Sequence, residues 1–150
     1  MRAARKAFTY VEAVLSILIF GILAAIILPH FVKEGFLGSL SLRAATTEIT
    51  SDIRYTRQLA ITNTGHYLIK FDFSAKEYKI YKDSIAPQNQ TGQTKQISSQ
   101  INCSGTDQFD FYSLGNCTFL GTGLLLSQGT SQNRVSAETT TGVVVVEKVS

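Results

Sequence analysis

A membrane-length apolar segment near the N-terminus limits what this chain can fold into. Residues 8–32 contain no Asp, Glu, Lys or Arg except Glu12, and residues 13–28 are uncharged throughout. At 1.5 Å per residue, a helix over residues 8–32 is roughly 37 Å long. The hydrocarbon core of a bilayer is about 30 Å thick. We therefore expect one transmembrane helix here, and an acid inside such a helix usually has a function.

The charges around this segment predict its orientation. Residues 1–7 contain Arg2, Arg5 and Lys6 and no acid, so the positive-inside rule places this end in the cytoplasm and the rest of the chain across the membrane. Without these three, 11 of the 14 basic residues remain, which equals the 11 acidic ones. A broadly basic nucleic-acid surface is therefore not expected.

Residues 33–65 have the spacing of an amphipathic helix. We expect Pro29, inside the apolar segment, to kink the helix, and Gly65 to mark the end of the amphipathic part. One apolar stripe repeats every three or four residues along this part: Leu42, Ala45, Ile49, Ile53, Thr56 and Ala60.

Residues 66–150 change to a period of two, which is typical of β-strands. The stretches HYLIKFDF and EYKIYK alternate apolar and polar side chains and are predicted to form a hairpin. Short strand candidates separated by Gly, Ser, Asn and Thr follow. The fold class expected is α+β: a long N-terminal helix, half in the membrane and half amphipathic, packed on an antiparallel sheet.

The two cysteines, Cys103 and Cys117, would lie on the exported side. A bond between them closes a loop of about 15 residues, worth about 3 kcal/mol in the chain-entropy model. We predict this disulfide; the alternative is a pair of reduced, buried thiols. Neither cysteine has the spacing of a metal site.

The arrangement RKA-FTYVE before an apolar helix resembles the class III signal of type IV pilins and pseudopilins. The resemblance implies that a membrane prepilin peptidase cuts between Ala7 and Phe8 on the cytoplasmic side and methylates the new amine of Phe8. Glu12 then becomes the fifth residue of the mature chain, and Pro29 occupies a position where many members carry proline. The sequence departs from the usual pattern with Ala7 in place of glycine before the cut.

Glu12 has an assigned role in this family. The resemblance implies that its carboxylate pairs with the N-terminal amine of an adjacent subunit and so sets the register of assembly. The alternative is a side chain that lies near the headgroups or pairs with Lys6. A cleaved secretory signal fits less well, since no small-x-small site follows the apolar run. A plain signal anchor gives no reason for Glu12.

A second resemblance covers nearly the whole chain. SDIRYTRQLAITNTGHYLIKFDF is similar to the helix-to-strand junction of H-type minor pseudopilins of type II secretion and of FimT-like minor pilins. It implies four parts: a leader (1–7), an assembly helix (8–32), an amphipathic helix (33–65) and a β-rich periplasmic or extracellular domain (66–150). The implied partners are the peptidase, other pilin or pseudopilin subunits, the inner-membrane assembly platform and the lipid bilayer.

Catalysis and cofactor binding are not expected. His30 and His66 are the only histidines, and we find no nucleophile, phosphate-loop or metal spacing. DNA binding is not expected either, because residues 115–150 contain only Arg134 and Lys148 as bases. A minor pilin or pseudopilin is therefore the main interpretation, in a secretion pseudopilus or in a pilus for adhesion, motility or DNA uptake. The rival is a non-assembling, single-span binding module.

Overall fold

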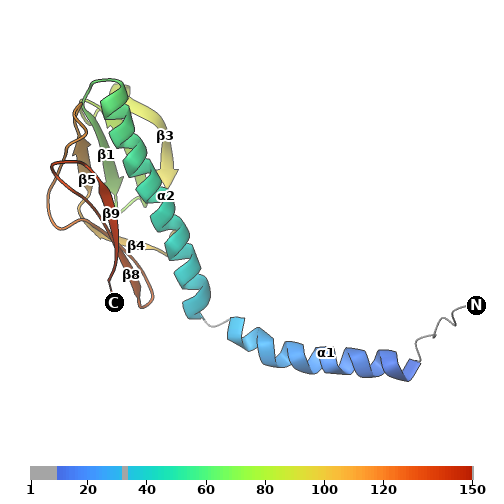
Figure 1. Ribbon diagram of the computed structural model, residues 1–150. Helices are drawn as coiled ribbons and strands as arrows, with labels where there is room; N and C mark the ends of the chain where they lie inside the picture. The colour runs from blue at the N-terminus through green and yellow to red at the C-terminus, as the bar shows by residue number, and fades with distance from the viewer. Residues whose placement is uncertain (1–9, 32–33, 150) are drawn as a thin grey trace, which may run out of the picture. The chain divides into compact units, whose positions relative to one another are not determined.

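The computed structural model of the chain describes residues 10–31 and 34–149, without the side chains of residues 27–37. Residues 1–37 and 38–150 form two compact units, which we describe separately. Helix α1 (Tyr10–Phe31) belongs to the first unit, and helix α2 (Glu34–Thr62) continues into the second (Figure 1).

Helix α1 consists almost wholly of apolar residues, which favour a helix that buries its whole circumference in an apolar surrounding. Pro29 lies within this helix, near its end. The kink expected at Pro29 stays a prediction. Among the residues described, we find no helix long and apolar enough to cross a membrane.

Helix α2 buries the predicted apolar stripe. Leu42, Ile49, Ile53 and Ala60 are at most 2% exposed, while most of the polar residues between them face solvent. The helix ends where Gly65 donates a backbone hydrogen bond to Ala60 O (3.0 Å), which satisfies a carbonyl of the last turn.

In the part of the chain that the structure describes, nine strands form two antiparallel sheets, where the sequence had suggested one. The first sheet has the order β3-β2-β1-β5-β6. Its hairpin β1–β2 is the one predicted from the alternating pattern, with Ile69 opposite Ile80 and Phe71 opposite Tyr78. The strands are β1 (Tyr67–Asp72), β2 (Glu77–Lys82), β3 (Gln90–Gln96), β5 (Gln108–Phe111) and β6 (Cys117–Phe119), and a short 3-10 helix, η1 (Pro87–Asn89), precedes β3.

The second sheet has the order β4-β7-β8-β9. Its strands are β4 (Asn102–Gly105), β7 (Leu124–Gln128), β8 (Ser131–Ala137) and β9 (Val144–Val149). The chain therefore alternates between sheets: β4 lies in the second, β5 and β6 in the first, and β7 in the second again.

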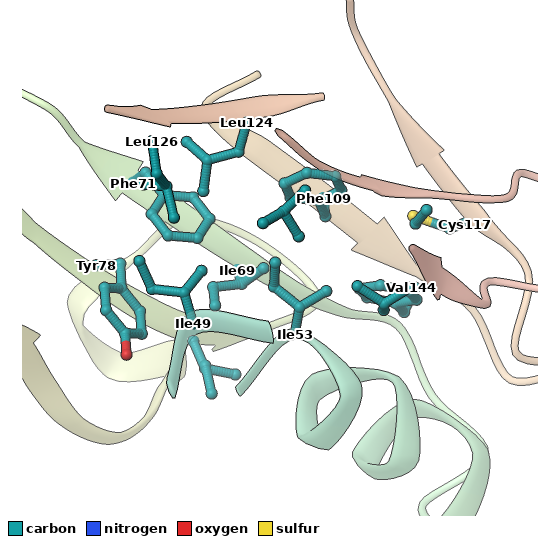
Figure 2. Packing of buried hydrophobic residues seen from close by; sticks show 14 of the residues in the cluster. Ile49, Ile53, Ile69, Phe71, Tyr78, Phe109, Cys117, Leu124, Leu126 and Val144 are labelled. Atoms are coloured by element: carbon teal, nitrogen blue, oxygen red, sulfur yellow. The ribbon is translucent and has the colours of Figure 1, made fainter. Parts of the chain in front are cut away.

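One hydrophobic core joins α2 to both sheets (Figure 2). Helix α2 contributes Ile49 and Ile53, the first sheet contributes Phe109, and the second contributes Leu124 and Val144. Phe109 packs against neighbouring aromatic rings in tilted and edge-on arrangements. The α+β class and the helix-on-sheet packing expected from the sequence are confirmed.

Candidate functional site

The first candidate site is the surface of α1. Its large apolar side chains from Tyr10 to Ile26 are 46–85% exposed. Glu12 lies in the first turn and is exposed, and Ser16 Oγ donates a hydrogen bond to the main-chain oxygen of Glu12 (2.7 Å). The predicted cleavage residues Ala7 and Phe8 lie outside the described residues. The predicted roles of Ala7, Phe8 and Glu12 stay predictions.

A buried carboxylate connects α2 to the first sheet. Asp52, which is 9% exposed, accepts a hydrogen bond from the Tyr78 hydroxyl of β2 (2.5 Å). The Lys95 ammonium of β3 lies 2.7 and 2.8 Å from its two carboxylate oxygens. Three charged or polar groups from three elements therefore satisfy one another.

This cluster stabilises the fold and is not suited to acid–base catalysis. Burial is the main cause that raises the pKa of Tyr78, and the hydrogen bond to Asp52 raises it further. A tyrosine kept protonated and a carboxylate already paired to Lys95 make a poor acid–base couple. The cluster instead fixes α2 against β2 and β3. Sequence reasoning missed it, because Lys95 lies 43 residues from Asp52 and no local pattern relates the two.

The opposite flank of α2 carries three arginines, two of which donate hydrogen bonds to main-chain carbonyls of the β-rich domain. Arg54 and Arg57 follow Arg43 by 11 and 14 residues, which are about three and four helical turns, so all three lie on one side of the helix. Arg54 donates a long hydrogen bond to the Val144 carbonyl of β9 (3.5 Å). Arg57 donates one to the Gly115 carbonyl in the β5–β6 turn (3.1 Å). We call these three residues the arginine flank.

His66 and the nearby acids form polar contacts rather than a reactive centre. His66 lies 3.0 Å from an oxygen of Asp110 and 3.1 Å from the Asp83 carbonyl, and its ring stacks on Tyr112. Asp107, whose side chain is 52% exposed, pairs with Lys70 at 2.5 Å. Within the described part of the chain, no group of His, Cys, Asp and Glu residues could hold a metal ion.

The predicted disulfide is not formed in this structure. Cys103 lies on β4 of the second sheet and is half-buried, and Cys117 lies on β6 of the first sheet and is buried; both are free thiols. Of the alternative, a pair of reduced and buried thiols, the burial applies to Cys117 and only in part to Cys103. Spacing along the chain could not show that the two strands belong to different sheets.

Burial makes the thiols resist ionisation. It raises the pKa of Cys103, and it raises the pKa of Cys117 from 9.0 to about 12, with the charge of Asp110 adding to the effect. Both thiols are therefore protonated at neutral pH and are weak nucleophiles.

The raised pKa of Cys117 predicts a loss of stability in alkali. The folded state keeps the thiol protonated, whereas the unfolded chain ionises near pH 9, so this contribution is intact below pH 9 and is lost as pH rises toward 12. We expect the free energy of unfolding to fall by about 1 kcal/mol per pH unit in this range. Guanidinium unfolding of the reduced full chain in detergent measures it.

The control for this prediction is Cys117→Ala. It lowers stability at every pH by leaving a small cavity, but it should flatten the slope between pH 9 and 12. The remaining slope includes the contributions of Tyr78, Cys103 and Lys79, whose pKa values are also raised. An unchanged slope in the variant would show that Cys117 ionises equally in both states.

Comparisons with known proteins give structural matches. No protein-family profile and no curated protein matches the sequence. The crystal structure of the type IV minor pilin FimU of Pseudomonas aeruginosa matches with a TM-score of 0.58 and 16% identity, over 75% of this chain and 92% of that one. The minor pseudopilin EpsH from the type 2 secretion system of Vibrio cholerae matches with a TM-score of 0.51 and 12% identity, over 74% and 96%. The chain has the type IV pilin-like fold that these two proteins share.

Proposed function

We propose that this chain, which has the pilin-like fold, is a minor subunit of a type IV pilin-like filament. The observation that carries the proposal is the extent of the structural match, which spans 92% and 96% of a minor pilin and a minor pseudopilin. The match therefore involves nearly all of each relative. A motif shared by unrelated folds would cover much less.

The N-terminal helix supplies the anchor and the assembly element in this proposal. Residues 8–32, which extend past the described residues at both ends, hold the chain in the cytoplasmic membrane as a single pass, with the β-rich domain on the periplasmic or extracellular side. The exposed apolar side chains of α1 support this, because water is an unfavourable surrounding for such a surface. In the filament, the same surface packs against the corresponding helices of other pilin or pseudopilin subunits.

Processing precedes assembly. The prepilin peptidase removes residues 1–7 and methylates the amine of Phe8, and the inner-membrane platform then inserts the subunit into the filament. Glu12 meets the amine of a neighbouring subunit at that step. No catalytic role, cofactor or DNA ligand is part of the proposal.

The expected mass of the mature chain tests the processing step. Intact-mass spectrometry of the chain, purified from membranes of cells that contain a prepilin peptidase, should show a protein that begins at Phe8 and carries one added methyl group. Ala7→Gly should be processed at least as fast, and a charged residue at this position should block the cut. A chain that retains Met1, or one cut after residue 32, would instead support the non-assembling binding module.

The proposal extends to a function in protein secretion through a type II pseudopilus, with a pilus for adhesion, motility or DNA uptake as the second candidate. One structural relative is a type IV minor pilin and the other a type 2 secretion pseudopilin, so a deletion phenotype is needed to decide between the two candidate functions. Deletion of the gene should abolish enzyme secretion while surface pili and DNA uptake persist. Loss of pili or of DNA uptake with normal secretion would favour the second candidate.

A further inference from the structure

The edge strand β9 differs from the other three sheet edges that the structure describes. Natural proteins protect edges with short strands, bulges or charges, because an open edge pairs readily with another strand. Strands β4 and β6 have four and three residues, and β3 is polar and shifts its register against β2. Strand β9 has six residues in regular register with β8, and its only charges, Glu147 and Lys148, lie near its end. Its residues Val145 and Val146 are 42% and 44% exposed.

The direction of the backbone groups of β9 follows from its first pairing. The Glu138 N–H donates to the Val143 carbonyl (2.9 Å), so the backbone groups of odd-numbered residues point to β8. Those of Val144, Val146 and Lys148 point away from the sheet. The Val144 carbonyl reaches Arg54 there, which agrees with this alternation. Beyond Val144, the backbone N–H and C=O groups of Val146 and Lys148 therefore face outward, where an added strand could pair with them.

The two faces of β9 differ in chemistry. Val144 is buried against the core, so the even-numbered side chains Val146 and Lys148 lie on the same face as Val144, whose carbonyl Arg54 of the arginine flank reaches. The odd-numbered face exposes Val143, Val145 and Glu147, and Glu147 lies opposite Arg134 of β8. A strand that adds to this edge therefore meets Arg54, Val146 and Lys148 along the even-numbered face and mostly valines on the other face. A matching strand alternates acidic residues with β-branched apolar ones.

We propose that the free edge of β9 and the arginine flank of α2 form a docking site for an extended acidic segment, which adds a fifth strand to the second sheet. Given the proposed function, the segment belongs to a neighbouring pilin-like subunit. Backbone hydrogen bonds supply the affinity, and the alternation of acidic and apolar side chains supplies the specificity.

A second copy of this chain fits the site poorly. The other edge strands that the structure describes, β3, β4 and β6, contain no Asp or Glu. Antiparallel pairing of β9 with another β9 places like faces together, so the partner's Glu147 falls opposite the valine face and away from Arg54. A different subunit is therefore the better partner.

A peptide that alternates glutamate and valine over six residues is the probe. Fluorescence anisotropy measures its binding to the full chain in detergent, beside a peptide with lysine in place of glutamate. We expect the acidic peptide to bind at least about tenfold more tightly, with an affinity that falls in high salt. Equal binding of the two peptides would show that the charge of the peptide does not affect binding at this edge, which would contradict the proposed acidic partner.

Two pairs of variants locate the binding. Val146→Pro removes an N–H that faces the free edge and leaves the pairing with β8 intact, so it should weaken peptide binding by about tenfold or more without lowering the unfolding temperature. Val146→Ile should bind as the parent does. Arg54→Ala should weaken binding, and Arg54→Lys should restore part of it. Unchanged binding by Val146→Pro would overturn strand addition.

Two further outcomes would also overturn the inference. One is a single-stranded oligonucleotide that binds at the arginine flank more tightly than the acidic peptide. The other is dimerisation of the chain alone, seen in sedimentation and abolished by Val146→Pro. The peptide assay does not depend on processing or assembly. A chain that is cut at Phe8 but ignores the peptide contradicts only this inference, and the reverse result contradicts only the proposed function.

Discussion

Replacement of Glu12 by alanine should leave the chain processed but absent from filaments. In the proposed processing, the peptidase acts on the residues around Ala7 and Phe8, and Glu12 follows Phe8 by four residues, about 6 Å along a helix. Cleavage should therefore proceed, with the mass of the mature chain changed only by the substitution. Incorporation into sheared or purified filaments should fall by at least about tenfold, because an amine and a carboxylate attract strongly where water is scarce.

Two matched variants separate the charge of Glu12 from its bulk. Glu12→Gln keeps the size of the side chain and loses the charge, so it should fail like alanine. Ser16→Ala, one turn away, removes only the hydroxyl that bonds the Glu12 carbonyl and should assemble normally. Quantitative immunoblots of the membrane and filament fractions measure both. Normal incorporation of Glu12→Gln would refute a role for the charge.

Local patterns predicted the elements that depend on local burial. The stripe from Leu42 to Ala60 identified α2, because one face of a helix must be apolar to cover a sheet. Alternation identified the hairpin of β1 and β2 in the same way. Leu68 is the exception, since it lies on the predicted polar face of β1 and is still buried. Its strand neighbours Tyr81 and Asp110 come from β2 and β5, and only the second is distant in sequence.

These patterns could not predict which strands pair with one another. Periodicity shows that a segment is extended and which face is apolar, but it does not state which strand lies beside it. Strand β1 pairs with β5, and β4 pairs with β7 across two intervening strands of the other sheet. The single expected sheet is two sheets for this reason. Cys103 and Cys117, which the predicted disulfide would join, lie on strands of different sheets and are free thiols in this structure.

The candidate sites divide in the same manner. Glu12 was predicted as a functional residue because its spacing from Phe8 matches a local motif, and its role stays a prediction. The bonds from Asp52 to Lys95 and from Arg54 to Val144 join residues 43 and 90 positions apart. Such contacts are products of the tertiary fold. The arginine flank can be read from the helix period alone, but its position beside β9 cannot.

Gly142→Ala should cost much more stability than an equivalent glycine replacement elsewhere. Gly142 lies in the β8–β9 turn with φ of +66°, donates a backbone hydrogen bond to Glu138 O (2.7 Å), and has no room for a methyl group. A β-carbon there would overlap the Gly115 carbonyl and would approach Arg57 Nε to 3.0 Å. Both belong to the contact that joins the β5–β6 turn to α2. We expect a loss of about 3 kcal/mol in the free energy of unfolding.

Gly129→Ala is the matched control, since Gly129 also has a positive φ, +58°, but a β-carbon there meets nothing within 4 Å. Its cost should be about 1 kcal/mol, the strain of the left-handed conformation alone. Guanidinium unfolding of both variants in the full chain gives the difference, and equal losses would show that the turn adjusts without cost. Because β9 begins two residues after Gly142, a displaced turn should also weaken binding of the acidic peptide at the β9 edge. Gly129→Ala should leave that binding unchanged, which would tie the docking edge to the packing of this turn against α2.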